Sequence, residues 1–361
     1  SAIPARPRPN WAGSRRPPSN SWWSAWCVPI WSASRAPLRC SRPMRALITG
    51  AGGFVGRYLV EALAARGASV TATGDHDAPA WCAEHGVTWH ALDVRDADAV
   101  ERVAGDAAPE VIFHLAAQSF VPESLAHPRE TFDANALGTL ALFQGLQRLR
   151  ARDLDPVVLV TSSAEVYGAI PQYDGPLEES RCTNPRNPYA ASKVAQEAIA
   201  QAAFHAWGIR SVIARAFNHT GPGQSRRFVV PSFAHRIAEI VAGGDPTLWV
   251  GNIESMRDFT DVRDVVRAYV LLAERGVAGE TYNVCSGYAY PVKDLLRDLI
   301  LLSHAALYVK EDRERLRPSD SPVLVGSNAK LRAATGWAPE IRIERTLEDV
   351  YAFERAALVR V

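Results

Sequence analysis

The sequence feature that most constrains the fold is a glycine-rich segment between an apolar run and a helical run. Residues 44–49 are a short apolar stretch of the kind that a buried parallel strand needs, and Gly50-Ala-Gly-Gly-Phe-Val-Gly56 follows at once. Residues 58–65 then continue as a helix. Glycines at these spacings let the backbone turn tightly and approach a pyrophosphate, while the helix N-terminus offers free N–H groups. This order predicts a dinucleotide-binding turn.

Strand-like and helix-like segments alternate from Met44 onward, which is typical of a doubly wound parallel sheet. The pattern predicts strands at 69–73, 89–92, 110–115, 157–161 and 211–214, and long helices at 131–149 and 189–207. Beyond Phe228 the alternation breaks down, until residues 280–287 supply a late strand and turn. We therefore expect an α/β fold, a doubly wound parallel Rossmann sheet with a smaller, discontinuous C-terminal substrate domain. The expected boundaries are 44–227 plus 258–290 for the Rossmann domain, and 228–257 plus 291–361 for the substrate domain.

Composition and charge are ordinary for an enzyme and exclude a few classes. The 361 residues are 47% hydrophobic and 22% charged, with a net charge of +1. Seven arginines and no acidic residue lie in 1–43, so residues 44–361 are net negative and nucleic acid is not an expected partner. The five cysteines show no close-spaced pair, which argues against a metal site or a disulfide framework and favours the cytoplasm.

The first 43 residues form a separate region. They hold eight of the 24 prolines and five of the ten tryptophans, and they end just before the first methionine. We expect a non-native or disordered extension, read ahead of a start at Met44. An export signal is a second interpretation, because Ser14-Arg15-Arg16 precedes an apolar stretch at 21–31. No segment reaches the roughly 20 apolar residues that span a bilayer, so no membrane association is expected.

Two further motifs indicate proton transfer. Thr161-Ser-Ser-Ala-Glu-Val-Tyr-Gly168 follows a predicted strand, and Tyr189-Ala-Ala-Ser-Lys193 begins a predicted helix. Residues four apart share one helix face, so Tyr189 and Lys193 point together, with Ser163 arriving from the strand end. A neighbouring ammonium and a cationic nicotinamide both favour an ionised phenol, so we expect Tyr189 to titrate near neutral pH. Tyr167 has no lysine four residues on, and we interpret it as structural.

The chain resembles the extended short-chain dehydrogenases/reductases that act on nucleotide sugars. The resemblance runs from Met44 to about Pro339 and covers five more segments: Phe113-His-Leu-Ala-Ala-Gln-Ser-Phe-Val-Pro122, Arg186-Asn-Pro-Tyr-Ala-Ala-Ser-Lys193, Arg215-Ala-Phe-Asn-His-Thr-Gly-Pro-Gly-Gln224, Arg257-Asp-Phe-Thr-Asp-Val-Arg-Asp264 and Tyr282-Asn-Val-Cys-Ser-Gly287. Within the family the match is strongest to reductases of GDP-4-keto-6-deoxy-D-mannose, which form GDP-rhamnose. GDP-mannose 4,6-dehydratases come second. The two long helices would bury their wide apolar faces in the core or in a homodimer or homotetramer interface.

The resemblance implies roles for individual residues. Tyr189 would protonate the alkoxide formed at C4 of the sugar, Ser163 would hydrogen-bond that oxygen, and Lys193 would hold the nicotinamide ribose. Asp93 with Val94 would contact adenine, although a turn or helix-capping role for Asp93 stays open. The implied cofactor-binding residues are Gly50, Gly53, Phe54, Val55, Gly56, Asp75, Asp93, Val94, Leu115, Ala116, Ala117, Tyr189, Lys193 and His219.

The cofactor is NADP or NAD. The acidic residue that hydrogen-bonds the ribose normally lies at the end of the second strand. This chain has Gly74 and then Asp75 there, with no arginine immediately after. Asp75 pointing inward favours NAD, whereas the resembled reductases often accept NADPH. We expect no metal.

The resemblance also implies a site for a GDP-linked keto-deoxy sugar, whose diphosphate calls for Asn and Arg. The implied substrate residues are Ser119, Ser163, Glu165, Asn218, Arg257, Arg317 and Asp320. Structural alternatives stay open: Arg257 could pair with Asp258 or Asp261, Asp264 could cap a helix at 265–275, and His219 could satisfy a turn.

Glu165 keeps a second activity open. A 4,6-dehydratase must also remove the C5 proton and expel the C6 hydroxyl, which needs an extra acid/base group near the serine. Glu165 sits at that position in the sequence, although reductases of the group also carry an acid there, and an exposed structural carboxylate is a further alternative. A non-catalytic dinucleotide-sensing protein is the third hypothesis, although it would not need all of Ser163, Tyr189 and Lys193.

Overall fold

The computed structural model describes residues 43–170, 172–312 and 321–359. The predicted extension, except Pro43, lies outside the described residues, as do the predicted substrate residues Arg317 and Asp320. No helix in the described part of the chain is long and apolar enough to cross a membrane.

A parallel seven-stranded sheet forms the centre of the fold, in the order β10-β6-β5-β4-β1-β2-β3. Its strands are β1 (Arg45–Thr49), β2 (Ser69–Gly74), β3 (Thr88–Ala91), β4 (Val111–His114), β5 (Val157–Ser163), β6 (Ser211–Ala216) and β10 (Thr281–Val284). β1 lies between β4 and β2, with Ala46 paired to Val111 on one side and to Val70 on the other. Most residues of β4, β5 and β6 are buried, because helices cover both faces. The predicted Rossmann sheet is confirmed.

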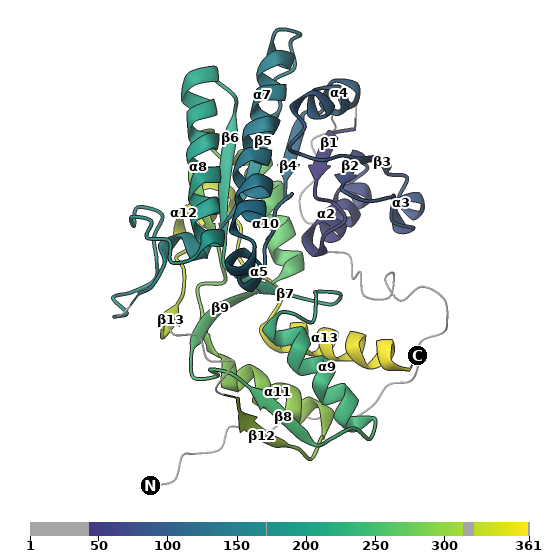
Figure 1. The fold of residues 1–361 in the computed structure, drawn as a ribbon, viewed down its shortest axis with the longest axis vertical. Helices are drawn as coiled ribbons and strands as arrows, with labels where there is room; N and C mark the ends of the chain where they lie inside the picture. The colour runs from purple at the N-terminus through teal and green to yellow at the C-terminus, as the bar shows by residue number, and fades with distance from the viewer. Residues whose placement is uncertain (1–42, 171, 313–320, 360–361) are drawn as a thin grey trace. The chain divides into compact units, whose positions relative to one another are not determined.

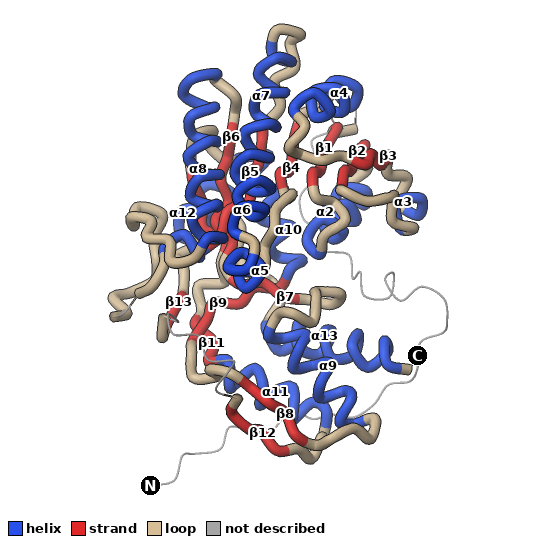
Figure 2. The backbone as a smooth tube through the Cα atoms, in the orientation of Figure 1, coloured by secondary structure: helices blue, strands red, loops and turns tan. Residues whose placement is uncertain are grey.

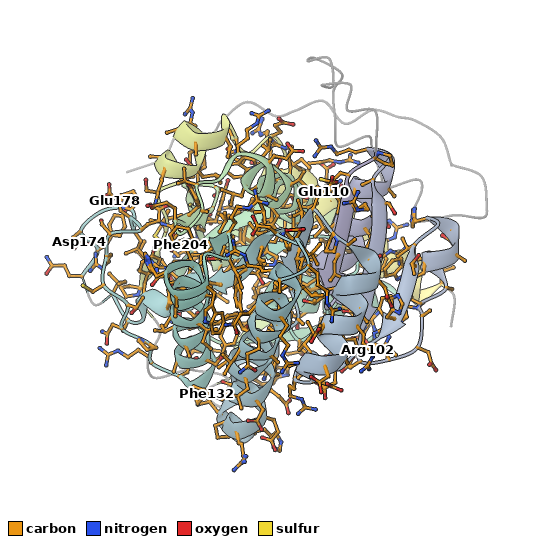
Figure 3. All side chains as sticks on the ribbon, turned by 90° about the horizontal axis from the view of Figure 1, so that it is seen from above. Arg102, Glu110, Phe132, Asp174, Glu178 and Phe204 are labelled. Carbon is orange, nitrogen blue, oxygen red and sulfur yellow. The ribbon has the colours of Figure 1, made fainter. Side chains whose placement is uncertain are left out.

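Two groups of helices cover the sheet (Figures 1 and 2). One group contains α4 (Ala97–Ala107), α7 (Gly138–Arg150) and α8 (Pro188–Trp207), and the other contains α2 (Phe54–Ala65), α10 (Val262–Arg275) and α12 (Ala329–Thr335). Shorter helices α3 (Trp81–Glu84), α5 (Val121–Ala126) and α6 (Pro128–Phe132) lie in the connections. Seen from above, side chains fill the space between ribbon elements (Figure 3). Leu47, Ile112 and Val158 of the sheet pack there against Leu142 and Phe143 of α7.

A second apolar cluster forms from later segments of the chain. Its helices are α9 (Val229–Val241), α11 (Val292–Ser303) and α13 (Ile343–Leu358), and Ile237, Leu299 and Leu347 are among the side chains at its centre. The accompanying strands are β7 (Asn218–Thr220), β8 (Thr247–Val250), β9 (Met256–Asp261), β11 (Ala289–Pro291), β12 (Tyr308–Glu311) and β13 (Val323–Leu324). β9 pairs with β7, β11 and β13, and β8 pairs with β12. The domain boundaries given above stay a prediction.

Residues 131–149 are helical throughout, as predicted, but the helix is not regular. That stretch contains the end of α6, a π-helix at Asp133–Leu137 and then α7. The π-turn directs the Asn135 side chain inward, where its Nδ2 donates to the carbonyl of Gln118 (3.0 Å) and to Ser192 Oγ (2.8 Å). A widened turn of this kind is a rare feature that apolar periodicity does not reveal.

Helix α10 also begins earlier than expected. Asp261 is its N-cap and accepts a hydrogen bond from the backbone N–H of Arg263 (2.8 Å), so the helix runs from Val262. Asp264 lies inside the first turn instead of capping it, and its Oδ2 accepts from the N–H groups of Glu340 (2.9 Å) and Ile341 (2.8 Å). The carboxylate therefore fastens the segment before α13 to α10.

Candidate active site

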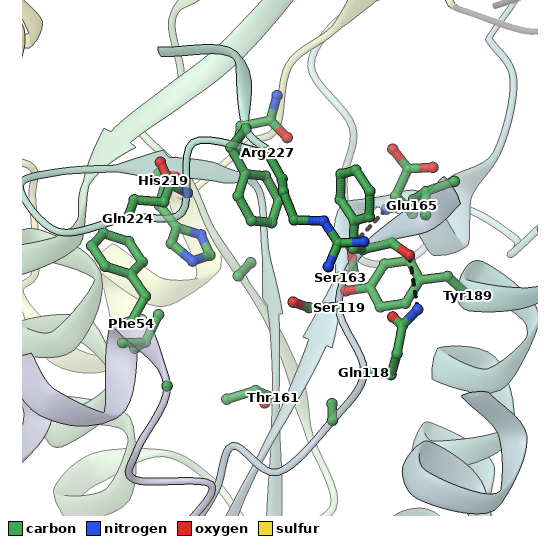
Figure 4. A pocket seen from close by; sticks show the side chains of 18 of the residues that line it. Phe54, Gln118, Ser119, Thr161, Ser163, Glu165, Tyr189, His219, Gln224 and Arg227 are labelled. Atoms are coloured by element: carbon green, nitrogen blue, oxygen red, sulfur yellow. Dashed lines mark hydrogen bonds between the residues drawn. The ribbon is translucent and has the colours of Figure 1, made fainter. Parts of the chain in front are cut away.

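A cavity of about 1170 Å³ opens at the carboxyl ends of the central strands (Figure 4). Ligands of open α/β sheets bind at this edge, because the loops that follow the strands diverge there. Every described residue that the sequence assigned to cofactor or substrate lines it: Gly50, Gly53, Phe54, Val55, Gly56, Asp75, Asp93, Val94, Leu115, Ala116, Ala117, Ser119, Ser163, Glu165, Tyr189, Lys193, Asn218, His219 and Arg257. The structure thus brings these residues together, while their roles stay predictions.

The glycine loop leaves no room for side chains. Gly50 has φ of +70°, and a Cβ there would lie 2.6 Å from the backbone of Ala116. A Cβ on Gly56 would lie 2.5 Å from the carbonyl oxygen of Ala51, so α2 can approach the loop only with glycine at this position. Gly53 caps α2 without a side-chain hydrogen bond, which leaves the first N–H groups of the helix for a ligand. This cradle fits the pyrophosphate of a dinucleotide.

Ser163, Tyr189 and Lys193 meet on the opposite wall of the cavity. Ser163 ends β5, and its Oγ accepts a hydrogen bond from the N–H of Glu165 (3.2 Å). Asn187 caps α8 through Ala190 N–H (2.8 Å), which sets the helix start so that Tyr189 and Lys193 share one face. The Ser163 hydroxyl lies beside the Tyr189 phenol and acts to lower the pKa of Tyr189.

The expectation that Tyr189 titrates near neutral pH includes the charge of a bound nicotinamide and stays a prediction, whereas the protein groups by themselves move the pKa of Tyr189 away from neutrality. Burial raises the pKa of Tyr189 to about 12, with Glu165 adding to the rise, while the hydrogen bond with Ser163 opposes it. The Lys193 Nζ is 6.0 Å from the centre of the phenol ring. At this distance the ammonium does not overcome desolvation, so Tyr189 carries its proton at neutral pH.

Lys193 is itself buried. Its Nζ donates to the carbonyl oxygen of Thr161 and to Gln196 Oε1, both at 2.8 Å. Burial lowers the pKa of Lys193 to about 7, and Glu197 opposes this shift. The charge on Lys193 is therefore sensitive to pH in the physiological range.

Glu165 lies in the 3₁₀ turn after Ser163 and lines the cavity. Its Oε2 accepts a hydrogen bond from Asn187 Nδ2 (3.2 Å). Figure 4 shows it beside Ser163 and Tyr189. The carboxylate is therefore held at the cavity wall near Ser163 and Tyr189.

At the second strand, Gly74 occupies the last position and Asp75 follows it in the cavity wall. A Cβ on Gly74 would lie 2.7 Å from the Trp89 ring, so that ring excludes an acidic side chain from the strand end. His76 stacks on Trp89 with ring centres 5.3 Å apart. The usual position of a ribose-binding acid is thus blocked by packing.

Asp93 has the turn role that the sequence left open. Its carboxylate accepts from the Arg95 N–H (2.9 Å) and pairs with the Arg95 guanidinium, which lowers the pKa of Asp93. The N-cap of α4 is Asp96 instead. Asp93 nevertheless lines the cavity, so an adenine contact stays compatible with its position.

His219 and Arg257 also have structural contacts at the cavity. His219 Nδ1 donates to the Phe217 carbonyl (3.0 Å), and its ring stacks on Phe54 with centres 6.3 Å apart. Burial lowers the pKa of His219. Arg257 Nη1 donates to the carbonyls of Met256 (2.9 Å) and Ser321 (2.8 Å), which holds its side chain at the cavity wall.

The Asp258 carboxylate, which the sequence offered as a possible partner of Arg257, binds the turn after β10. Its carboxylate accepts hydrogen bonds from Ser286 Oγ (2.7 Å) and from the N–H groups of Ser286 (2.8 Å) and Gly287 (3.0 Å). Burial raises the pKa of Asp258 to about 6, and these hydrogen bonds oppose the rise. Asp258 thus stabilises the turn after β10.

Sequence reasoning missed an aromatic and cationic group at the cavity mouth. Arg227 lies over the Phe120 ring at 4.0 Å and donates to Glu123 Oε2 (2.9 Å), while Phe228 packs edge-on against Phe120 (5.8 Å). Phe120 lies within a family motif, but Arg227 and Phe228 lie in a stretch whose pattern indicated no regular element. Among the described residues, no group of three His, Cys, Asp or Glu could hold a metal ion.

The chain is similar to known proteins over most of its length. The model of the GDP-mannose 4,6 dehydratase family matches residues 47–350. GDP-6-deoxy-D-mannose reductase of Pseudomonas aeruginosa is 38% identical over 85% of this chain and 95% of its own length. GDP-mannose 4,6-dehydratase of Vibrio cholerae is 25% identical over 88% and 96%. The structure of RMD from Pseudomonas aeruginosa complexed with NADPH has a TM-score of 0.76 and 35% identity, covering 87% of this chain and all of that one.

The family resemblance predicted from the sequence is therefore confirmed. The match includes the glycine loop and the Ser163, Tyr189 and Lys193 motifs, and it ends within α13. The chain belongs to the GDP-mannose 4,6 dehydratase family.

Proposed function

We propose that this protein reduces the C4 ketone of GDP-4-keto-6-deoxy-D-mannose with NADPH or NADH and releases a GDP-6-deoxyhexose, GDP-rhamnose. The observation that carries the proposal is the meeting of Ser163, Tyr189 and Lys193 with the glycine loop in one cavity. The reductase relative, at 38% identity, favours this step over the dehydratase relative at 25%.

The proton chemistry follows from the positions of the side chains. A bound reduced nicotinamide supplies the hydride for C4. Tyr189 donates its proton to the ketone oxygen, and the pKa of about 12 ensures that the phenol is protonated before the reaction. Ser163 hydrogen-bonds the same oxygen as charge develops on it, and Lys193 binds the nicotinamide ribose with an ammonium proton.

The cofactor would be held by the glycine loop, the N-terminus of α2 and residues 115–117. The bound NADPH of the Pseudomonas RMD structure and the glycine at the end of β2 support the phosphorylated cofactor, since an acid at that strand end would repel a 2′-phosphate. NADH stays an alternative because Asp75 lines the cavity.

For the substrate, we propose that Asn218 and Arg257 bind the diphosphate while Ser119 and Glu165 face the hexose. Guanidinium and amide groups match a diphosphate, and all four residues line the cavity. The predicted contribution of Arg317 and Asp320 to the nucleoside end lies outside the described residues. Residues 228–257 and 291–361 would form the substrate domain.

A spectrophotometric assay tests the proposal. The protein is mixed with GDP-4-keto-6-deoxymannose and either NADPH or NADH, and the product is identified by mass. We expect one reduced nicotinamide to be consumed for each sugar converted, with a mass gain of two hydrogens. Product without net nicotinamide oxidation would contradict the reductase assignment.

A second candidate function is GDP-mannose 4,6-dehydration, favoured by the position of Glu165 beside Ser163 and Tyr189. GDP-mannose is then the substrate, the mass falls by one water, and nicotinamide absorbance does not change. Glu165→Gln would abolish this dehydration, because proton removal from C5 needs the carboxylate. The same substitution should affect ketone reduction much less.

We also infer a homodimer or homotetramer in the cytoplasm. The long helices α7 and α8 support an oligomer, because their apolar residues exceed one narrow stripe and a second copy of the chain would cover the additional apolar face. Light scattering of the purified protein tests the oligomeric state.

A further inference from the structure

A chain of buried hydrogen bonds runs from Lys193 away from the cavity. Lys193 Nζ donates to Gln196 Oε1 (2.8 Å), and Gln196 Nε2 donates to Thr139 Oγ1 (2.8 Å). His114 Nε2 lies 2.9 Å from the same hydroxyl, and His114 Nδ1 lies 2.8 Å from Thr49 Oγ1. The side chains come from β1, β4, α7 and α8, and all but Lys193, at 3%, are 0 or 1% exposed.

The direction of every bond in this chain is fixed. Thr139 Oγ1 gives its one proton to the carbonyl of Asn135 (2.6 Å), so it can only accept from Gln196 and from His114. Gln196 therefore turns its carbonyl oxygen towards Lys193, since an ammonium has no acceptor. His114 carries its proton on Nε2 and accepts from Thr49 at Nδ1.

We propose that Gln196, held by Thr139 and His114, is a positioning residue for Lys193: it binds one ammonium proton, stabilises the charged form and leaves a further proton directed into the cavity. The Thr161 carbonyl takes the second proton (2.8 Å), so one of three remains for the cofactor. This inference rests on the proposed function, because it concerns the lysine that would bind the nicotinamide ribose.

Lys193 lies among several titratable groups, and it is the one whose charge changes near neutral pH and can be stabilised by Gln196. Burial lowers the pKa of Lys193 to about 7, and Glu197 on the same helix opposes this. His114 on β4 has a pKa of about 3 because of burial and the nearby Lys193, and Tyr189 has one of about 12 with Glu165 beyond it. His114 and Tyr189 thus keep one protonation state around neutral pH, while Lys193 titrates.

NADPH binding measured by fluorescence between about pH 6 and pH 9 tests the inference. A neutral lysine keeps only two N–H protons, which the Thr161 carbonyl and Gln196 accept, so only the charged lysine has a third proton for the ribose. Wild-type affinity should fall as the pH rises through the pKa of Lys193. Gln196→Met removes the acceptor and should move this fall to lower pH, which weakens binding about tenfold at pH 8. Gln196→Glu adds a negative charge and should move it to higher pH.

Gln201→Met and Gln201→Glu, at an exposed position of the same helix, are matched controls and should follow the wild type. Thr139→Val keeps the contact between Gln196 and Lys193 but removes the hydroxyl that holds the Gln196 amide. The fall in NADPH affinity should then move to lower pH, as in Gln196→Met, with affinity weaker by about threefold. Thr139→Val serves as the test variant if Gln196→Met does not fold. Shifts in the same direction for both Gln196 variants, or no shifts, would overturn the inference. Wild-type protein that binds no NADPH would instead count against the proposed function.

Discussion

At the residue scale, burial sets the protonation states of the groups around the candidate reaction centre. The pKa of Tyr189 is raised and the pKa values of Lys193 and His114 are lowered, in each case chiefly because the charged form loses hydration. These shifts make a phenol that begins as a proton donor and a lysine whose charge depends on pH. Two predictions follow from individual side chains.

Tyr189→Phe removes the proposed proton donor and little else, because the ring stays. We expect kcat for ketone reduction to fall by about a thousandfold, while the NADPH dissociation constant changes less than about twofold. Steady-state rates and a fluorescence titration measure the two quantities. Tyr288→Phe, which removes a hydroxyl from an exposed ring, is the control. Undiminished turnover in Tyr189→Phe would contradict the assignment of this residue.

His114 should make the fold sensitive to acid. The unfolded chain takes up a proton at His114 below a pH of about 6.5, whereas the folded protein resists until about 3. Its contribution to stability is thus present above pH 6.5 and is lost as the pH falls. We expect about 2 kcal/mol of this loss between about pH 6.5 and 5. Urea unfolding should show a weaker pH dependence for His114→Gln than for wild type, while His127→Gln, at an exposed site, matches wild type.

At the scale of elements, the contact between the glycine loop and α2 determines whether a dinucleotide can bind. A helix that starts this close to a strand needs positions without Cβ, and Gly56 supplies one of them against Ala51. The π-turn before α7 also sets a contact between elements, because it directs the Asn135 side chain into the core, where it hydrogen-bonds Ser192. No apolar repeat in the sequence sets the geometry of the glycine loop or of the π-turn.

Gly56→Ala should displace α2 from the loop, since the new methyl group would meet the Ala51 carbonyl at 2.5 Å. We expect a loss of about 2 kcal/mol in unfolding free energy and about tenfold or more weaker NADPH binding. Gly105→Ala, inside helix α4, is the control: its Cβ would make an ordinary 3.4 Å contact with Leu149 of α7, and it should stabilise the fold by about 0.5–1 kcal/mol. Equal NADPH affinity in Gly56→Ala and wild type would refute the proposed close approach.

At the scale of the whole described structure, buried ion pairs join the segments around the central sheet to those of the second apolar cluster. Arg263, at the start of α10, contacts Asp261 (2.7 Å) and Asp349 of α13 (2.8 Å), and Thr346 Oγ1 donates to Asp261 (2.7 Å). These side chains are almost fully buried. The position of α13 against α10 therefore depends on charge pairing as well as on apolar packing.

Asp349→Ala should remove one carboxylate from Arg263 and leave part of a buried guanidinium charge uncompensated. We expect a loss of about 3 kcal/mol in the free energy of unfolding by denaturant. The neighbouring Glu348→Ala, which breaks only a partly exposed pair with Arg345 (3.3 Å), should cost about 0.5 kcal/mol or less. Similar losses in the two variants would show that Asp349 does not stabilise the fold through its buried pair.

The sequence alone determined the central fold and the family. Strand, loop and helix follow each other in the order that a Rossmann sheet requires, and local patterns such as apolar strands and helical spacing do not depend on distant contacts. For the same reason helical spacing alone places Tyr189 and Lys193 on one helix face, and the glycine spacing alone predicts a pyrophosphate-binding turn.

Only the tertiary structure decided the protonation states and the neighbours of these residues. Burial is a property of the packed molecule, so the raised pKa of Tyr189 and the chain from Lys193 through Gln196 to His114 depend on elements far apart in sequence. Arg227 reached the cavity mouth in the same way, through packing on Phe120. Sequence periodicity records which side chains are apolar, but it carries no information about which polar groups meet once those apolar faces are buried.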